Sequence, residues 1–396
     1  MKILNKIALG LSFAALVASC GKEDPAPKTA GNFELSSNIT SDRVLETGNV
    51  YTLNGRVAVT SGATLTIQPG VIIKAVEGTG ENASALIIAR GAKIMAEGTA
   101  SSPIIFTTTA DAIVPGMIVS PNLNENDNSF WGGLIILGKA KGSFSGNVSE
   151  FAIDGIPAVD ENGKYGGSDD ADNSGVLKYV SIRHGGANIG NGNEINGLTL
   201  GCVGSETVIE NVEIVGNQDD GIEWFGGTVN VKNAIVWNAG DDAIDTDQAW
   251  SGTLDNFVVI SAGDKCFELD GPEGAYNGTG HTLTNGTIMA ESAVGLVDFD
   301  DNSDVSMSNI YFTSLKEGQV VDGFDGYAAN TNGYAIQSFQ ATLPTVDNSG
   351  NPKTYTTADF FGTAAGFVTE VSTPTVGANT SVLTSWSFAG QSGKIN

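Results

Sequence analysis

Short runs of Val, Ile and Leu, separated by Gly, Asn and Asp, dominate the middle of the chain. Within them one pattern recurs, in which two residues and an asparagine precede an apolar strand. The five asparagines are Asn211, Asn233, Asn256, Asn285 and Asn309, at separations of 22, 23, 29 and 24 residues. A period of about 22–24 residues, made of short β-branched strands and polar turns, is typical of the coil of a parallel β-helix, whose strands stack about 4.8 Å apart.

The predicted fold class is therefore all-β, a single-stranded parallel β-helix. Asparagine at one fixed place in successive coils favours an internal ladder of side-chain amides, because each amide can bond to the next and satisfy polar groups at a tight corner. We expect the five asparagines to form this structural ladder. A polar strip that contacts a substrate is the alternative.

The same alternation extends upstream of the repeats. Apolar runs at 62–73, 85–94, 102–107 and 131–138 predict early coils, so the β-helix is expected over residues 34–315. Polar stretches at 110–129 and 143–174 predict long inserted loops, which often carry function. The period is lost from about residue 316, and residues 316–396 are expected to form an irregular C-terminal cap, because an uncovered solenoid end would aggregate.

The N-terminus has a different pattern. Lys2 and Lys6 accompany an apolar run of about 11 residues, at 7–17, which is the layout of a signal peptide and too short to span a membrane. The run ends in Val-Ala-Ser-Cys, which resembles the lipobox read by bacterial lipoprotein signal peptidase. We therefore predict a signal peptide at 1–19, lipidation at Cys20 and a lipidated tether at 20–33. An ordinary signal peptide with a cysteine near its end is the alternative.

The residues after Cys20 bear on location. Gly-Lys-Glu-Asp-Pro at 21–25 resembles the short export signal that sends Bacteroidota lipoproteins to the outer face of the outer membrane. The predicted location is therefore the outer membrane, with the protein held by its lipid and facing the cell exterior. A solvated acidic linker would have a similar sequence.

Charge and residue usage narrow the function classes. The chain has 19 basic and 45 acidic residues, a formal net charge of −26. Such a surface repels nucleic acid and suits a cation, a neutral glycan or solubility alone. With only two histidines, neither a His-based zinc site nor a Ser-His-Asp triad is expected. Cys202 and Cys266 have apolar neighbours and are predicted to be buried free thiols, with a disulfide as the alternative.

Several motifs carry a family resemblance. They are Trp-Gly-Gly-Leu-Ile-Ile-Leu-Gly at 131–138, Tyr-Gly-Gly at 165–167, Asp-Asn-Ser-Gly-Val-Leu-Lys-Tyr-Val at 172–180 and Asp-Asp-Gly-Ile-Glu-Trp-Phe-Gly-Gly-Thr-Val at 219–229. Together they resemble the signatures of a functionally uncharacterised family of Bacteroidota and myxobacterial cell-surface lipoproteins, over roughly residues 45–310. The resemblance implies a right-handed parallel β-helix on an outer membrane and no particular activity.

Carboxylates recur with the coil period on three successive coils. The asparagine offsets align Asp219 with Asp241 and Asp264, Asp220 with Asp242 and Lys265, Glu223 with Asp245 and Glu268, and Phe225 with Asp247 and Asp270. Stacked carboxylates repel one another, and a hard cation such as Ca²⁺ would offset that repulsion. The predicted Ca²⁺ ligands are Asp219, Glu223, Asp241, Asp245, Asp247, Glu268 and Asp270. Raised pKa values or hydrated acidic turns are the alternatives.

A catalytic interpretation also follows from one motif. Gly-Asp-Asp-Ala-Ile at 240–244 resembles the paired-aspartate motif of polygalacturonases, β-helical enzymes that place an acid and a base beside the scissile bond. The match is partial, because Asn-Gln-Asp stands at 217–219 in place of Asn-Thr-Asp and the later Gly-His-Gly and Arg-Ile-Lys motifs are missing. The catalytic candidates are Asp220, Asp241, Asp242 and Asp245, and a lyase would need Lys265 as its base.

Two functional hypotheses result. The leading one is a non-enzymatic, surface-exposed scaffold that binds an extracellular glycan or a partner in an outer-membrane complex, stabilised by Ca²⁺. The alternative is a polysaccharide hydrolase or lyase that uses the acidic columns. Arg183 and His184 are expected to lie in a turn after a strand, and Trp224, Trp237 and Trp250, spaced by 13 residues, are not expected to form one stacked column.

Overall fold

The computed structural model describes residues 33–153, 156–188, 195–329 and 336–396. The predicted signal peptide, Cys20 and the tether up to residue 32 lie outside the described residues, so lipidation stays a prediction. In the part of the chain that the structure describes, no helix is long and apolar enough to cross a membrane.

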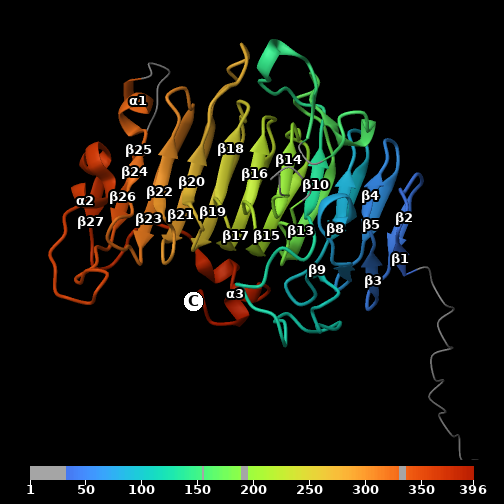
Figure 1. Ribbon diagram of the computed structural model, residues 1–396, viewed down its shortest axis with the longest axis horizontal. Coiled ribbons are helices and arrows are strands. Elements are labelled where there is room, and N and C mark those ends of the chain that lie inside the picture. The colour runs from blue at the N-terminus through green and yellow to red at the C-terminus, as the bar shows by residue number, and fades with distance from the viewer. Residues whose placement is uncertain (1–32, 154–155, 189–194, 330–335) are drawn as a thin grey trace, which may run out of the picture. The chain divides into compact units, whose positions relative to one another are not determined.

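Short strands stack coil upon coil in two large parallel sheets (Figure 1). Sheet 2 has nine strands, which are β4 (Arg56–Val59), β7 (Ala85–Ile88), β10 (Leu134–Leu137), β14 (Leu198–Gly201), β16 (Ile222–Phe225), β18 (Ile244–Asp247), β20 (Lys265–Leu269), β22 (Gly295–Phe299) and β24 (Val321–Asp322). All of its neighbouring strands pair in parallel. The predicted all-β parallel β-helix is thus confirmed.

Sheet 1 supplies the rest of each coil. Its first strands are short, namely β1 (Glu34–Leu35), β2 (Arg43–Leu45), β3 (Val50–Leu53), β5 (Thr64–Ile67), β6 (Ile72–Ala75), β8 (Lys93–Glu97) and β9 (Ile104–Thr108). Six long strands follow, β13 (Gly175–Arg183), β15 (Val208–Asn217), β17 (Asn230–Ala239), β19 (Thr253–Ile260), β21 (His281–Met289) and β23 (Val305–Thr313). The sheet ends in β25 (Ile336–Gln337), β26 (Phe339–Ala341) and β27 (Val368–Glu370).

The five repeated asparagines mark the bend of the long strands. Each has a positive φ, between 56° and 62°, and the pairing of neighbouring strands skips that residue. Asparagine tolerates this left-handed conformation better than other side chains with a Cβ, except aspartate. The repeat read from the sequence is therefore a repeat of backbone bends.

The asparagine side chains bond to one another in two groups. Asn233 donates to Asn211 (3.1 Å), Asn256 to Asn233 (2.7 Å), and Asn309 to Asn285 (3.1 Å). Asn285 instead donates to Asp255, and the Asn256 oxygen accepts the backbone N–H of Asn379. The expected ladder is thus interrupted between Asn256 and Asn285. Because the chain around Asn379 packs on the outside of the solenoid, the ladder lies at the outer surface and is not internal.

Apolar side chains on alternate strand positions fill the solenoid. Ile222 and Trp224 of β16 point inward and are fully buried, as are Ile244 and Phe267 on the next two coils. The rings of Trp224 and Trp250 stack with centroids 4.6 Å apart, whereas Trp237 packs against Phe388, so the three tryptophans do not form one stacked column, as expected. Trp250 reaches Trp224 because it lies in the turn after β18. All of these tryptophans are buried, so none offers an exposed ring.

The predicted loop at 143–174 covers the outer face of sheet 2 over the early coils. It holds the short helices η2 (Ser145–Asn147) and η3 (Glu161–Gly163) and the hairpin β11 (Phe151–Ala152) and β12 (Lys164–Tyr165). Phe144, Ile153 and Tyr165 pack on Ile135 and Leu137 of β10. The outer face of sheet 2 is therefore apolar and covered over the early coils. From β16 onward this face carries acidic side chains.

Residues 316–396 divide into two parts. A cap formed by β24 to β27 with α1 (Phe324–Ala329), α2 (Ala358–Phe361) and η4 (Gly362–Phe367) continues the coils. The remaining segment, residues 372–396, turns back along the outside of sheet 1 and includes η5 (Thr380–Val382) and α3 (Phe388–Gln391). Figure 1 shows α3 beside β15 and β17. We call residues 379–396 the C-terminal strap.

Candidate functional site

An acidic face begins on sheet 2 where the apolar cover ends. Glu223, Asp245, Glu268, Asp298 and Asp322 occupy paired positions on β16, β18, β20, β22 and β24. Their strands are neighbours at the usual spacing of about 4.8 Å. Asp247, Asp270 and Asp300 form a second column, because each directly follows one of the paired residues Thr246, Leu269 and Phe299. These eight residues define the acidic face.

Burial changes along the first column. Glu223 and Asp245 are 9% and 8% exposed, Glu268 and Asp298 are half-buried, and Asp322 is exposed. Burial raises the pKa of Glu223 and of Asp245 well above the ordinary range, and the neighbouring carboxylates, including Asp220, raise it further. Asp245 in its protonated form donates to Glu223. The carboxyl groups at the buried end of the column are thus either protonated or neutralised by a cation.

Asn196 joins this buried end. Its side-chain nitrogen donates to Glu223, while its oxygen is buried and has no partner among the described residues. The Oδ1 of Asp245 is likewise buried and unpartnered in the described part of the chain. A buried oxygen without a donor is an arrangement that a cation or a proton would satisfy.

Asp220 and Asp242 each accept a hydrogen bond from the backbone of the following coil. Asp220 accepts the N–H of Asp242 (2.9 Å), and Asp242 accepts the N–H of Lys265 (2.6 Å). Burial, followed by a hydrogen bond to Glu268 and the charge of Asp220, raises the pKa of Asp242 to about 9. At neutral pH Asp242 is therefore a protonated acid that donates to Glu268.

The second column is also protonated more readily than usual. Burial raises the pKa of Asp247 to about 8, against the opposing hydrogen bond from the Gln248 N–H. Burial and the charges of Glu268 and Asp300 raise the pKa of Asp270 to about 6. In the second column, Asp270 and Asp247 therefore gain their negative charges at about pH 6 and about pH 8.

Lys265 is the basic residue beside these columns. Its ammonium lies 3.3 Å from Asp264, and its side chain lies over Gly295, where a Cβ would come within 2.4 Å of the lysine Cδ. Partial burial opposes its charge, but Asp264, Asp298 and Asp322 raise the pKa of Lys265. Lys265 is therefore charged and acts as a counter-charge, not as a base with a lowered pKa.

Three groups of carboxylates in the described residues have oxygens within 4.8 Å of one another. They are Asp219 with Asp220 and Asp241, Asp220 with Glu223 and Asp245, and Asp241 with Asp242 and Asp264. The predicted ligands Asp219, Asp241, Glu223 and Asp245 enter these groups, whereas Asp247, Glu268 and Asp270 do not. All donors are oxygens, which suits a hard cation such as Ca²⁺. The second group fits best, because its surroundings include the two unpartnered oxygens.

An aromatic ring lies beside the acidic face. Phe225 is half-buried, occupies the position paired with Asp247, and packs against Tyr165 with centroids 6.1 Å apart. In contrast, Arg183 and His184 are fully buried beneath loop 110–129 and the strap, so they do not join this site. Cys202 and Cys266 are buried free thiols.

The sequence offsets did not identify Asp298, Asp322 or Asn196. Asp298 and Asp322 were missed because loop 271–280 is inserted between Asn256 and Asn285 and lengthens that step to 29 residues. A signal was nevertheless present, because Phe-Glu-Leu-Asp at 267–270 and Val-Asp-Phe-Asp at 297–300 share the same alternation of apolar and acidic residues. For Asn196 the sequence carries no comparable signal.

Comparison with known proteins gave one result. The family model described as a pectate-lyase-like β-helix domain matches residues 37–389. No curated protein and no solved structure gave a match.

Proposed function

The chain belongs to the family of pectate-lyase-like β-helix domains, and from that premise we propose that it binds a polysaccharide along the acidic face of sheet 2. A polysaccharide-related role fits the family. The observation that supports this particular surface is the unbroken row Glu223, Asp245, Glu268, Asp298 and Asp322 on five consecutive strands. A row of equally spaced groups along the solenoid axis matches an extended polymer of repeating units.

The chemistry of the row favours hydroxyl groups as ligands. Carboxylates accept hydrogen bonds from sugar hydroxyls, and such charge-assisted bonds are stronger than neutral ones. Phe225 at the buried end offers a ring against which a sugar can pack. Lys265, the lysine beside the row in the described part of the chain, is paired with Asp264, so a neutral glycan is favoured over an acidic one.

We propose that Ca²⁺ occupies the buried end of the row. Asp220, Glu223 and Asp245 would hold it, with the Asn196 oxygen as a further donor. The cation would neutralise carboxylates that otherwise take up protons and would fix their orientation.

An enzymatic role is the second candidate, and the pair Asp242 and Glu268 favours it. Asp242 is a protonated acid at neutral pH and lies in hydrogen-bond contact with another carboxyl group. Glycoside hydrolysis uses one protonated and one ionised carboxyl group, although its two groups flank the scissile bond and stand further apart than a hydrogen-bonded pair. However, Asp242 is 3% exposed and its oxygen is engaged by the Lys265 N–H, which leaves little access for a substrate.

We also propose that the protein is a lipoprotein anchored through Cys20 to the outer membrane, with the β-helix facing outward. The sequence resemblance to Bacteroidota and myxobacterial surface lipoproteins supports this location. A glycan, or a protein complex in the same membrane, would then be the partner within reach.

Affinity electrophoresis in gels that contain neutral or acidic polysaccharides tests the proposal. We expect retardation by at least one neutral polysaccharide, weakened by a calcium chelator, with no new reducing or unsaturated ends. Release of such ends by the wild type and its loss in Asp242→Asn would favour the enzyme instead. Migration unaffected by every polysaccharide would contradict the proposed function.

A further inference from the structure

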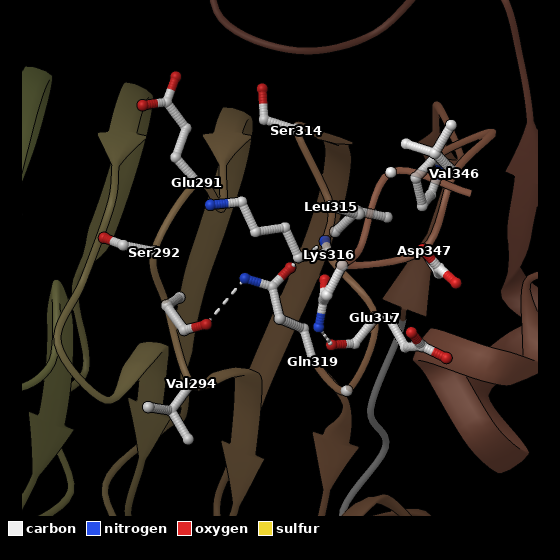
Figure 2. A pocket seen from close by; sticks show the side chains of 15 residues that line it. Glu291, Ser292, Val294, Ser314, Leu315, Lys316, Glu317, Gln319, Val346 and Asp347 are labelled. Carbon is white, nitrogen blue, oxygen red and sulfur yellow. Dashed lines mark hydrogen bonds between the residues drawn. The ribbon is translucent and has the colours of Figure 1, made fainter. Parts of the chain in front are cut away.

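A groove of about 1170 Å³ lies away from the acidic columns, at the turns that precede β22 and β24. Three connections line it, namely the turn after β21, the turn after β23 and the loop after β26 (Figure 2). Its volume slightly exceeds the range of about 300–1,000 Å³ that is usual for pockets that hold small molecules.

The walls of the groove are fixed by hydrogen bonds. The buried side chain of Gln319 donates to the carbonyl groups of Ala290 and Ala293 (2.8 Å for the latter), and its oxygen accepts the N–H of Lys316 (2.8 Å). Asn348 donates to the Glu317 carbonyl from the third connection. The groove is therefore preformed, and a ligand would not have to order it.

The charges in the groove are balanced except at one lysine. Glu291 pairs with Lys394 of the strap at 2.7 Å, and Glu317 pairs with Lys353. Hydrogen bonds from Asn351 and from the Ser349 N–H hold the pKa of Asp347 below its usual value. Thus each of the three carboxylates has its own donors.

Lys316 is the remaining charge. Among the described residues no carboxylate lies within ion-pair distance of its ammonium, which Figure 2 shows extending from its own turn toward the turn that carries Glu291. The Lys316 side chain is exposed and lines the groove, so its ammonium is accessible to a ligand there. It offers a place for an anionic group of a ligand.

The rest of the lining suits a hydroxylated ring. Ser292 and Ser314 present exposed hydroxyls, while Val294, Pro344 and Val346 present apolar surface. The overall charge of −26 repels a long polyanion much more strongly than a small ligand with a single charge, so the electrostatic cost is smaller for the small ligand. We propose that this groove is a second binding site, for a small, singly charged anionic sugar whose charged group pairs with Lys316.

Isothermal titration calorimetry with glucuronate, glucose 6-sulfate and glucose tests this site and does not depend on the proposed function. We expect one or both anionic sugars to bind and glucose to bind at least tenfold more weakly. Lys316→Ala should weaken anion binding at least tenfold, and Lys316→Arg should keep it within about threefold, since a tenfold change corresponds to about 1.4 kcal/mol. Lys93→Ala, which removes another exposed lysine, is the matched control.

The outcomes separate the two sites. Substitutions on the acidic face should leave binding of the anionic sugar unchanged, and Lys316→Ala should leave polysaccharide retardation unchanged. Equal binding of glucuronate by wild type and Lys316→Ala, equal binding of glucose and glucuronate, or binding of neither anionic sugar by the folded protein would overturn the proposal.

Discussion

Asp242→Asn should stabilise the protein at neutral pH, although it alters a buried residue. The structure raises the pKa of Asp242 from 3.8 to about 9. At pH 7 the folded carboxyl group is therefore protonated while the unfolded one is ionised, so folding must take up a proton. The cost is the difference between pH 7 and 3.8, or 3.2 pH units at 1.36 kcal/mol each, which is about 4 kcal/mol.

Asparagine removes this cost without removing the contacts. Its side-chain oxygen can still accept the Lys265 N–H, and its NH₂ group can donate to Glu268 as the protonated acid does. The sign of the pH dependence follows from a raised acid pKa. The wild type keeps its full stability below about pH 4 and loses it as the pH rises toward about 9, so the advantage of Asp242→Asn grows over that window.

Urea unfolding followed by tryptophan fluorescence, with chelator present, measures this difference. We expect the free energies of unfolding of the two proteins to agree at pH 4, and Asp242→Asn to be more stable by up to about 4 kcal/mol at pH 7. Glu206→Gln, an exposed turn residue, should change stability by less than about 0.5 kcal/mol at either pH. A loss of stability at pH 7, or a difference that does not widen from pH 4 to pH 7, would refute the reasoning.

Three further predictions concern the coil, the strap and the cation. Asn233→Ala should lower the free energy of unfolding in urea by about 2–3 kcal/mol, because it loses two ladder hydrogen bonds and strains a residue at φ 59°. Asn233→Gly loses the same bonds without the strain and should cost less. Equal costs for the two variants would count against backbone strain. Trp386→Ala should cost about 3–5 kcal/mol and increase proteolysis of the strap, whereas an unchanged melting temperature would mean that the strap is not packed in solution. Ca²⁺ should raise the melting temperature of the wild type but not of Asp245→Asn, and an identical shift in both would remove the cation from the buried cluster.

The coil architecture was predictable because it depends on short-range signals. A bend that needs a positive φ selects asparagine, and one asparagine per coil gives a period that can be read directly from the sequence. The alignment of Glu223 with Asp245 and Glu268 followed from that period, and the strand register agrees with it.

The position of the strap and the burial of the acidic residues depend on long-range contacts, which the coil period does not predict. The strap lies on sheet 1 because buried Glu213 accepts the N–H groups of Phe388 and Ala389, residues 175 and 176 positions away in the sequence. Asp298 was missed because the inserted loop 271–280 lengthens one coil. Which acidic residues are buried, and so protonated, depends on the loops that cover them and not on their spacing.

The most direct test of the central claim is calorimetric titration of the acidic face with the polysaccharide that retards the wild type most strongly. Glu268→Gln combined with Asp298→Asn changes the half-buried middle of the row. Glu210→Gln combined with Asp255→Asn changes two similarly half-buried carboxylates on sheet 1 and is the matched control. We expect the first pair to weaken binding at least tenfold and the control pair to leave it unchanged. Equal affinity of all three proteins would show that the polysaccharide does not bind along the acidic face.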